Sequence, residues 1–336
     1  MSSSSRRVVV TQRFFDAETR AWLEQHGCEV VIADLPPGKG DGDLTPAELE
    51  GLLAGAAGWI VGHARVTRDL LTALPRLQVI SRRGVGYERV DTDAVRDLGR
   101  VACIAAGGND ASVADHVVAM MLALGRRFRE SQDRMLGGDW SILMGSDLYR
   151  KTVGIVGLGR IGRSVAQRLQ GFEAEILVNT PAFDVEDLGG RLTPVGLDDL
   201  LARSDYVTLH APLTAETRFL IDAAALTRMK PTAFLINAAR GGLVDDLALL
   251  EALSSGAIAG AGLDTFMSES DPGYRPTTEA LLALPNVVAT PHAAASSREG
   301  LDRTNRVAAM NVVAVLDGGS PPAACVVADG RAVAPA

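Results

Sequence analysis

The sequence predicts an α/β protein built from two doubly wound parallel-sheet domains. Short apolar strands alternate with amphipathic helices along the chain, in one series before residue 100 and in a second series from Thr152 onward. This alternation is typical of a parallel sheet that helices cover on both faces. The length of 336 residues supports two domains, since a domain takes about 150 residues.

The first series begins with Val8–Val10, a continuous apolar run of the kind that forms a buried strand. Asp16–His26 has the spacing of an amphipathic helix, and Gly27 ends it. Thr45 before Pro46 is a good helix start, because proline is tolerated in the first helical turn. Further strands are expected at Glu29–Ala33, Gly58–Val61 and Leu77–Ser81.

The second series starts at Thr152 and contains more elements than the first. Strands are expected at Val153–Val156, Glu175–Asn179, Tyr206–His210, Ala233–Asn237, Ala259–Leu263 and Val287–Ala289. Helices are expected at Ile161–Leu169, Leu197–Ala202, Asp222–Met229, Asp246–Ser254 and Leu301–Leu316. From Gly318 onward the chain is rich in Pro, Ala and Gly, and this tail is expected to fray.

Composition and charge exclude several classes of function. Acidic residues outnumber basic ones 41 to 33, and the net charge of −8 opposes binding to nucleic acid or to an anionic membrane. The apolar stretch Val117–Leu124 is far shorter than a membrane span, and no signal-peptide core follows Met1–Arg7. Cys28, Cys103 and Cys325 lack the spacing of a metal site or a disulfide framework. We therefore expect a cytoplasmic protein without a metal.

A glycine-rich loop, Gly157–Gly162, fits the pattern GxGxxG directly after one expected strand and before an expected helix. Glycines in this pattern allow a tight turn, the close approach of a pyrophosphate and tight packing of the helix. The helix N-terminus then offers N–H groups and a positive dipole end to the anion. This context favours a dinucleotide-binding loop over an ordinary tight turn. The loop residues expected at the cofactor are Gly157, Gly159, Arg160, Ile161 and Gly162.

The next strand lacks the acid that commonly binds the adenosine ribose. It ends at Asn179 and Thr180, which we expect at the cofactor, and none of residues 172–190 is Lys or Arg. The missing carboxylate removes a charge that would repel the 2′-phosphate of NADP. Three acids that would repel it follow at Asp184, Glu186 and Asp187. The two effects oppose each other, so NADP stays possible, with a slight preference for NAD.

Polar residues follow three strands of the second series at the point where each strand ends. The carboxyl ends of parallel strands face the ligand crevice, so these side chains are expected to converge. An arginine can hold a carboxylate through two parallel hydrogen bonds. A histidine exchanges a proton near neutral pH, and a nearby glutamate favours its charged form. Each residue alone has an ordinary structural explanation, but the set behind a dinucleotide loop indicates a reactive site. Its members are Arg240, Asp264, Glu269 and His292.

The motifs that point to a family are Ser81–Tyr87, Gly157–Gly162, His210–Thr214, Asn237–Asp245, Leu263–Glu269 and Thr290–His292. In this order they resemble the D-isomer-specific 2-hydroxyacid dehydrogenase family, over nearly the whole chain up to about Gly318. The resemblance implies a central Rossmann dinucleotide-binding domain inserted into a flavodoxin-like substrate domain. The boundaries we expect are 100–292 for the first, and 1–99 with 293–336 for the second.

The resemblance also implies roles for individual residues. Arg240 would bind the carboxylate and carbonyl of a small anionic substrate, His292 would act as the acid/base, and Glu269 would tune His292. Further cofactor contacts would come from His210, Pro212, Ala238 and Asp264. The substrate loop, whose backbone N–H groups cradle a carboxylate, would consist of Arg83, Gly84, Val85 and Gly86. Hydride chemistry belongs to the cofactor, so no metal is required.

The leading hypothesis is an NAD(P)-dependent D-2-hydroxyacid dehydrogenase, which transfers a hydride between a nicotinamide cofactor and a small 2-hydroxy or 2-keto acid. Arg82 and Arg83 motivate an alternative enzyme that dehydrogenates a phosphonate or phosphite. A third hypothesis is an NAD(H)-sensing interaction protein with the same fold. The resemblance further implies a homodimer, with Ala111–Gly138 as a contact region.

Overall fold

The computed structural model describes residues 6–181, 189 and 191–331, and it divides the chain into two compact units. Unit 1 contains Met1–Asn109 and Ser297–Ala336, and unit 2 contains Asp110–Ser296. The sequence placed the divisions at residues 99 and 292. The first division lies later in the structure because β5 (Val101–Ile104) pairs with a strand of unit 1.

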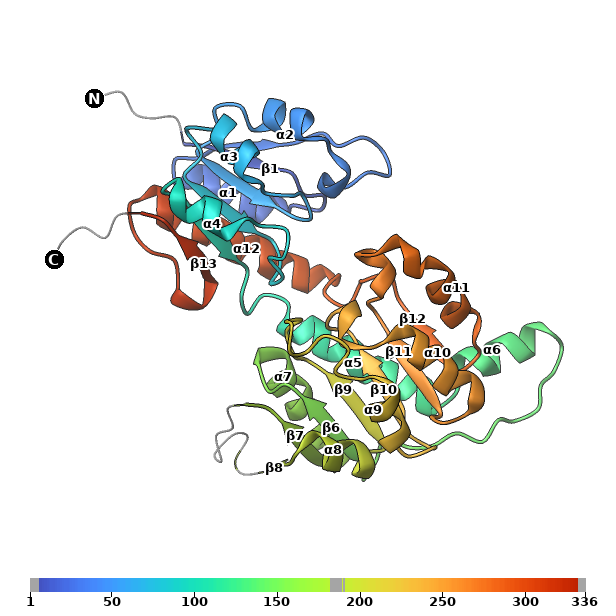
Figure 1. Cartoon of the computed structure of the whole chain (residues 1–336). Helices are drawn as coiled ribbons and strands as arrows, with labels where there is room; N and C mark the ends of the chain where they lie inside the picture. Colours follow the sequence, from blue (N-terminus) through green and yellow to red (C-terminus); the bar gives the residue numbers. More distant parts are fainter. Residues whose placement is uncertain (1–5, 182–188, 190, 332–336) are drawn as a thin grey trace, which may run out of the picture. The chain divides into compact units, whose positions relative to one another are not determined.

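Unit 1 holds a six-stranded sheet in the order β13-β5-β4-β3-β1-β2 (Figure 1). All pairs except β13 with β5 are parallel, and the order 2-1-3-4-5 is that of the flavodoxin-like fold. Its strands besides β5 are β1 (Arg7–Val10), β2 (Glu29–Ile32), β3 (Gly58–Val61), β4 (Val79–Arg82) and β13 (Val326–Asp329). Its helices are α1 (Ala17–Gln25), α2 (Pro46–Leu53), α3 (Arg68–Ala73), α4 (Thr92–Asp97) and α12 (Arg298–Leu316).

Apolar side chains cover both faces of the unit 1 sheet. On one face, Val8 and Val10 of β1 share a cluster with Val312 of α12. On the other face, Trp59 of β3 shares a cluster with Leu71 of α3. Alternate residues of these strands therefore point into two separate cores, as the continuous apolar runs require.

The C-terminal tail is more ordered than the sequence indicated. We expected it to fray, but β13 pairs antiparallel with β5 and places Val326 opposite Cys103. Ala328 is 2% exposed and Cys325 is buried as well. The expectation was wrong because these few apolar residues pair with a strand more than 200 residues away in the chain. The local composition of the tail does not reveal such a pairing.

Unit 2 holds a seven-stranded sheet in the order β12-β11-β10-β9-β6-β7-β8, with every pair parallel. This order extends the Rossmann order 3-2-1-4-5-6 by one strand. Its strands are β6 (Thr152–Val156), β7 (Glu175–Asn179), β8 (Leu192–Pro194), β9 (Tyr206–Leu209), β10 (Phe234–Asn237), β11 (Gly260–Leu263) and β12 (Val287–Ala289). Its helices are α5 (Asp110–Gly125), α6 (Phe128–Leu136), α7 (Arg160–Leu169), α8 (Leu197–Arg203), α9 (Ala223–Arg228), α10 (Asp246–Ser255) and α11 (Arg275–Ala283).

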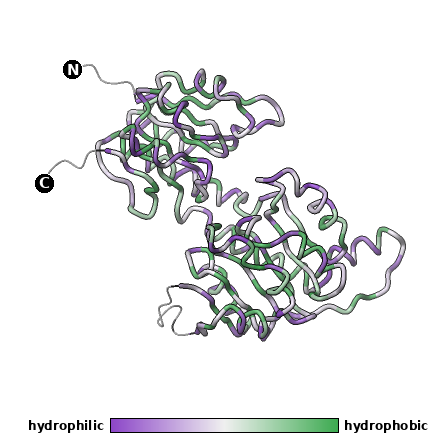
Figure 2. Tube along the Cα trace, viewed as in Figure 1, coloured by the Kyte–Doolittle hydropathy of each residue, from purple (hydrophilic) through white to green (hydrophobic). Residues whose placement is uncertain are grey.

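The unit 2 sheet also separates two apolar cores. Leu235 packs with Leu249 of α10 on one face, and Ile155 packs with Met121 of α5 on the other. Figure 2 shows hydrophobic stretches along the strands of both units. The two parallel α/β sheets confirm the predicted fold class. Among the described residues, no helix combines the length and apolar character that crossing a membrane requires.

Candidate functional site

The glycine-rich loop lies between β6 and α7 and has the shape that a dinucleotide requires. Gly157 has φ +94°, and a Cβ there would lie 2.7 Å from the carbonyl carbon of His210, so only glycine fits. A Cβ on Gly162 would lie 2.3 Å from the carbonyl oxygen of Gly157. At Gly159, by contrast, nothing lies within 4 Å, and α7 begins there without a side-chain cap. The open space and uncapped N–H groups fit a pyrophosphate.

The end of β7 carries the two residues expected at the adenosine ribose. Asn179 donates from Nδ2 to the carbonyl of Val195 at 3.1 Å, and its own carbonyl accepts the N–H of Gly157 at 2.8 Å. Thr180 follows it and is half-buried. The acids weighed against NADP lie outside the described residues; they are Asp184, Glu186 and Asp187. The described end of this strand therefore offers an amide and a hydroxyl rather than a carboxylate.

The loop after β9 lies against the glycine-rich loop. His210 donates its N–H to the carbonyl of Val156 at 2.7 Å, and its Nε2 lies 3.0 Å from the hydroxyl of Thr208. Burial lowers the pKa of His210 to about 4, so its ring is neutral at pH 7. The carbonyl of Pro212 accepts a hydrogen bond from the hydroxyl of Thr217 at 2.6 Å. At neutral pH His210 thus adds no charge to the site.

Arg240 follows β10 and is fixed by the last residue of that strand. Asn237 donates from Nδ2 to the carbonyl of Arg240 at 2.8 Å, and its Oδ1 accepts the N–H of Ala239 at 3.1 Å. Nη1 of Arg240 donates to the carbonyl of Ala239 at 2.7 Å. Ala238, expected at the cofactor, is half-buried in the same turn. The sequence Asn-Ala-Ala-Arg therefore forms a closed turn that positions the arginine.

The Arg240 turn packs against the segment that carries Glu269. A Cβ on Gly241 would lie 2.3 Å from the carbonyl oxygen of Phe266, so this close approach requires glycine. The charge of Arg240 is also among the influences that lower the pKa of Glu269. Arg240 and Glu269, which follow different strands, are thus brought together as expected from the sheet order.

Glu269 and His292 form a hydrogen-bonded pair. Nδ1 of His292 lies 2.7 Å from one carboxylate oxygen of Glu269, and the other oxygen accepts the N–H of Phe266 at 2.8 Å. Burial opposes ionisation of Glu269, but the bonds from His292 and Phe266 outweigh it and hold the pKa of Glu269 below its ordinary value. The His292 side chain is 43% exposed. An ionised glutamate therefore orients an accessible imidazole.

The loop that carries His292 is held by Asp264. His292 has φ +53°, and its N–H donates to the carbonyl of Asp264 at 2.8 Å. The Asp264 side chain is fully buried, and its two oxygens accept the N–H groups of Ala293 at 2.7 Å and Ala294 at 2.9 Å. The Thr290 hydroxyl donates to the same carboxylate at 2.5 Å. In this structure the carboxylate of Asp264, a residue expected at the cofactor, bonds the histidine loop.

Sequence reasoning missed two side chains that support this arrangement. Nε2 of His116 on α5 lies 2.9 Å from the Thr290 hydroxyl, and Asp246 on α10 accepts the N–H of Met267 at 3.0 Å. Thr290 lies in the motif Thr290–His292, in which only His292 was expected to have a role at the site. Asp246 follows Asp245, which is a helix cap, and an acid in a first helical turn is common enough to pass unnoticed.

In unit 1, the expected substrate loop Gly84–Gly86 directly follows β4 and Arg83. Nη1 of Arg83 donates to the carbonyl of Arg13 at 2.8 Å and lies 3.5 Å from Oδ1 of Asn305. Burial lowers the pKa of Arg83, while the charge of Asp41 opposes that effect. The Nη1 atom of Arg83 is therefore directed toward Arg13 and Asn305, which belong to the same unit.

Arg82 points to different partners from Arg83. Its Nη2 lies 3.4 Å from Nδ1 of His63, and a Cβ on Gly84 would lie 3.0 Å from its Nη1. Val85 is half-buried and Gly86 is buried. Of the two adjacent arginines, one thus lies beside the first glycine of the loop and the other is turned toward Arg13.

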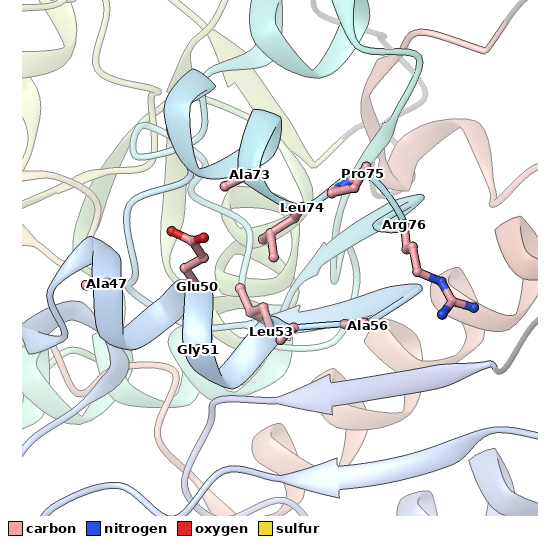
Figure 3. Close-up of a pocket in the computed structure, with 11 residues that line it drawn as sticks. Ala47, Glu50, Gly51, Leu53, Ala56, Ala73, Leu74, Pro75 and Arg76 are labelled. Carbon is pink, nitrogen blue, oxygen red and sulfur yellow. The ribbon is translucent and has the colours of Figure 1, made fainter.

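A cavity of about 470 Å³ in unit 1 contains none of the expected site residues. Leu53 and Leu74 line it, and Figure 3 shows it between the ends of α2 and α3. These residues precede β3 and β4, whereas Gly84–Gly86 follows β4, so the cavity and the loop lie at opposite edges of the sheet.

The described residues also contain no group of three or more metal-binding side chains.

Comparison with known proteins agrees with the fold and the family that the motifs indicated. A family model described as "D-isomer specific 2-hydroxyacid dehydrogenase, NAD binding domain" matches residues 118–294. Glyoxylate/hydroxypyruvate reductase B of Pectobacterium carotovorum subsp. carotovorum is 38% identical, over 93% of this chain and 95% of that protein. The chain belongs to the D-isomer-specific 2-hydroxyacid dehydrogenase family, as the motifs indicated, and carries its NAD-binding domain.

Two further relatives place the chain within this family. D-3-phosphoglycerate dehydrogenase of Mycobacterium tuberculosis is 40% identical, over 79% of this chain and 50% of that protein. The chain thus spans about half the length of this relative. The NAD complex of a D-isomer-specific 2-hydroxyacid dehydrogenase from Lactobacillus delbrueckii ssp. bulgaricus has a TM-score of 0.81 at 26% identity, covering 95% of this chain and 99% of that one.

Proposed function

We propose that the protein is an NAD-dependent oxidoreductase that transfers a hydride between a nicotinamide cofactor and a small 2-hydroxy or 2-keto acid. The observation that carries this proposal is the 2.7 Å contact between His292 and Glu269, in the same unit as the open glycine loop. Family membership supports it, because one relative is named for glyoxylate and hydroxypyruvate, which are 2-oxo acids.

His292 is the proposed acid/base. In reduction its Nε2 gives a proton to the carbonyl oxygen of the acid, and in oxidation it takes the hydroxyl proton. Glu269 bonds the other ring nitrogen, so it fixes the orientation of the ring. A general acid/base of this kind contributes about 10²–10⁴-fold in rate.

Arg240 is the proposed partner of the substrate carboxylate. Its guanidinium can hold a carboxylate through two parallel hydrogen bonds, a geometry that lysine does not offer. The closed turn at Asn237 limits the freedom of its backbone. In unit 1, the backbone N–H groups of Gly84–Gly86 are the proposed anion cradle, with Arg82 above Gly84.

The glycine loop and the end of β7 are the proposed cofactor site. A bound nicotinamide cofactor supplies or takes up the hydride. Gly159 and the start of α7 would hold its pyrophosphate, and Asn179 with Thr180 would face its ribose. Membership in a family with an NAD-binding domain supports NAD. The absence of a carboxylate at the described end of β7 keeps NADP as a second substrate to test.

One assay matrix tests the proposal. NADH and NADPH are each supplied with a panel of 2-keto acids, and NAD and NADP are each supplied with phosphite or phosphonates. Steady NADH oxidation by glyoxylate or hydroxypyruvate supports the proposal. Reduction of the oxidised cofactor by phosphite alone assigns the alternative enzyme. Tight NADH binding without turnover of any acid contradicts the proposal and favours an NAD(H)-sensing interaction protein.

Replacement of Arg240 tests the carboxylate contact. Because hydrogen bonds to charged groups contribute about 1.5–3 kcal/mol, Arg240→Ala should raise KM for the keto acid by roughly 10- to 100-fold. Arg240→Lys should recover only part of this loss. Steady-state kinetics at saturating NADH measure both variants, and an unchanged KM in Arg240→Ala contradicts the assigned role.

We also propose a homodimer formed through α6 and the segment after it, which projects from the sheet of unit 2 (Figure 1). Large apolar side chains are exposed there, and the most exposed are Leu136 by 80%, Trp140 by 75%, Ile142 by 94% and Met144 by 85%. Such exposure in one segment is unusual for a monomer. In our proposal a second copy of this chain covers the segment, since α6 lies within Ala111–Gly138, the region expected to form the contact.

Light scattering after size-exclusion chromatography tests the dimer. Ile142→Asp should convert a dimeric wild type to a monomer, because a charge would enter the apolar interface. Leu247→Asp is the matched control, since Leu247 is 52% exposed on α10, outside the proposed contact. A wild type that is monomeric at all concentrations, or an Ile142→Asp variant that stays dimeric, contradicts the proposal.

A further inference from the structure

A buried carboxylate lies beside the turn that carries Glu269. Asp246 is the first residue of α10 and is only 3% exposed. Its neighbour Asp245 already caps the helix by accepting the N–H groups of Leu247 and Ala248. The Oδ2 atom of Asp246 instead accepts the N–H of Met267 at 3.0 Å. The side chain of Asp246 therefore binds the backbone of another element and does not cap its own helix.

Met267 begins the short 3-10 turn Met267–Glu269. Within this turn, the carboxylate of Glu269 accepts the N–H of Phe266 at 2.8 Å. Two consecutive N–H groups are thus held by two carboxylates, one from Glu269 and one from Asp246. Any displacement of Met267 would move Glu269, which is two residues further on and bonds His292 at 2.7 Å.

We propose that Asp246 is a positioning residue for the Glu269–His292 pair, because it anchors the turn from which Glu269 reaches His292. Its role in activity rests on the proposed function. The hydrogen bond from Met267 to Asp246 does not depend on the identity of the substrate. The anchoring role and the proposed function can therefore fail separately.

The charge of Asp246 makes this anchor sensitive to acid. Burial raises the pKa of Asp246 to about 6; the Met267 N–H opposes this, and the charges of Asp245 and Glu269 add to it. Glu269 in turn faces Arg240 and His292. As the pH falls through about 6, Asp246 becomes neutral and its charge-assisted bond to Met267 weakens.

The amide resonance of Met267 tests the anchor without any substrate. In the wild type it should titrate with a midpoint near 6, and this titration should vanish in Asp246→Asn. The control is Asp222→Asn, because Asp222 also accepts a backbone N–H, that of Ala225, but at the start of its own helix α9. That control should keep the Met267 titration. A Met267 amide that does not titrate near pH 6, or that titrates equally in Asp246→Asn, overturns the proposal.

Kinetics test the consequence for the reacting pair. Asp246→Ala should lower kcat about tenfold with unchanged NADH affinity, since misplacing a reacting group by 1 Å can cost ~10²-fold. Asp246→Asn keeps an acceptor for Met267, so it should recover most of kcat at pH 7.5. It should also lose the fall in kcat that the wild type has below pH 6.

The kinetic outcomes distinguish a role of Asp246 in positioning the Glu269–His292 pair from a general loss of structure in the variants. Equal kcat in Asp246→Ala and the wild type, or equal loss in both variants with an unchanged pH profile, overturns the proposal. Circular dichroism confirms folding of each variant. If the wild type reduces no keto acid but the Met267 amide titrates as expected, the proposed function fails and the anchoring role stands.

Discussion

His292, the proposed acid/base, has an uncommon backbone conformation. Its φ of +53° lies in the left-handed region, where non-glycine residues are uncommon and histidine is enriched. Such conformations cost about 1–3 kcal/mol and persist only where the surroundings enforce them. Asp264 supplies that constraint through the N–H groups of Ala293 and Ala294. The accessible imidazole is thus presented by a loop that a buried carboxylate holds in place.

Gly159 offers the sharpest residue-level test of the cofactor site. Gly159→Ala should leave the melting temperature unchanged, because a Cβ there meets nothing within 4 Å. It should weaken NADH binding at least tenfold, since the methyl group would occupy the space of the pyrophosphate. Fluorescence titration measures the affinity. Gly171→Ala is the control, because its Cβ also meets nothing, and equal NADH affinity in both variants contradicts the assignment.

The lowered pKa of the half-buried His210 predicts a pH dependence of stability. Its pKa falls to about 4 in the folded protein, whereas an unfolded histidine titrates near ~6.5. The unfolded chain therefore binds a proton that the folded chain resists, and stability is lost as pH falls from about 6.5 toward 4. Each pKa unit is worth about 1.4 kcal/mol. His210→Gln should flatten the decline of melting temperature with acid, while His26→Gln, at an exposed position, should not. Parallel curves for wild type and His210→Gln contradict this prediction.

The residues proposed to react are easier to single out from the sequence than the residues whose contacts support them. Arg240, Glu269 and His292 each follow an expected strand, so a parallel sheet brings them to one edge. The supporting contacts are long-range pairings: Asp246 with Met267 is separated by 21 positions, and His116 with Thr290 by 174. No periodicity or motif in the sequence specifies such pairs.

At the level of elements, the predicted strands of both series are present because each is a compact apolar run between turn residues. β13 was missed because an edge strand needs only a few buried residues and gains its order from β5. β8 (Leu192–Pro194) was missed for a similar reason, since only Leu192 of its three residues is buried.

The strand β13 can be tested by placing a charge on its buried side. Ala328→Asp should lower the free energy of unfolding by about 2–4 kcal/mol, because it buries an unpaired carboxylate. Ala324→Asp, at an exposed position nearby, should change it by less than ~0.5 kcal/mol. Urea denaturation of both variants measures the difference. Equal stability of the two would mean that β13 is not part of the folded sheet.

At the scale of the whole molecule, the chain forms one unit, leaves it after Asn109 to form the second, and returns after Ser296. The sequence predicted this insertion from the mid-chain position of the glycine loop. The predicted boundary at residue 99 lies before β5. The sequence of β5 is a short apolar run followed by the long apolar helix α5, and such a run does not reveal which of the two sheets it joins. In both sheets the proposed site residues follow the carboxyl ends of strands. They are Gly84–Gly86 in unit 1 and Arg240, Glu269 and His292 in unit 2.

Replacement of His292 is the sharpest test of whether this residue moves the proton during hydride transfer. NADH-dependent reduction of glyoxylate and hydroxypyruvate is measured for the wild type and for His292→Gln, with NADH affinity measured for both. We expect the replacement to leave NADH affinity unchanged and to lower kcat by about 10²–10⁴-fold, because it removes the proposed acid/base. Equal kcat in the two proteins, at equal NADH affinity, would contradict it.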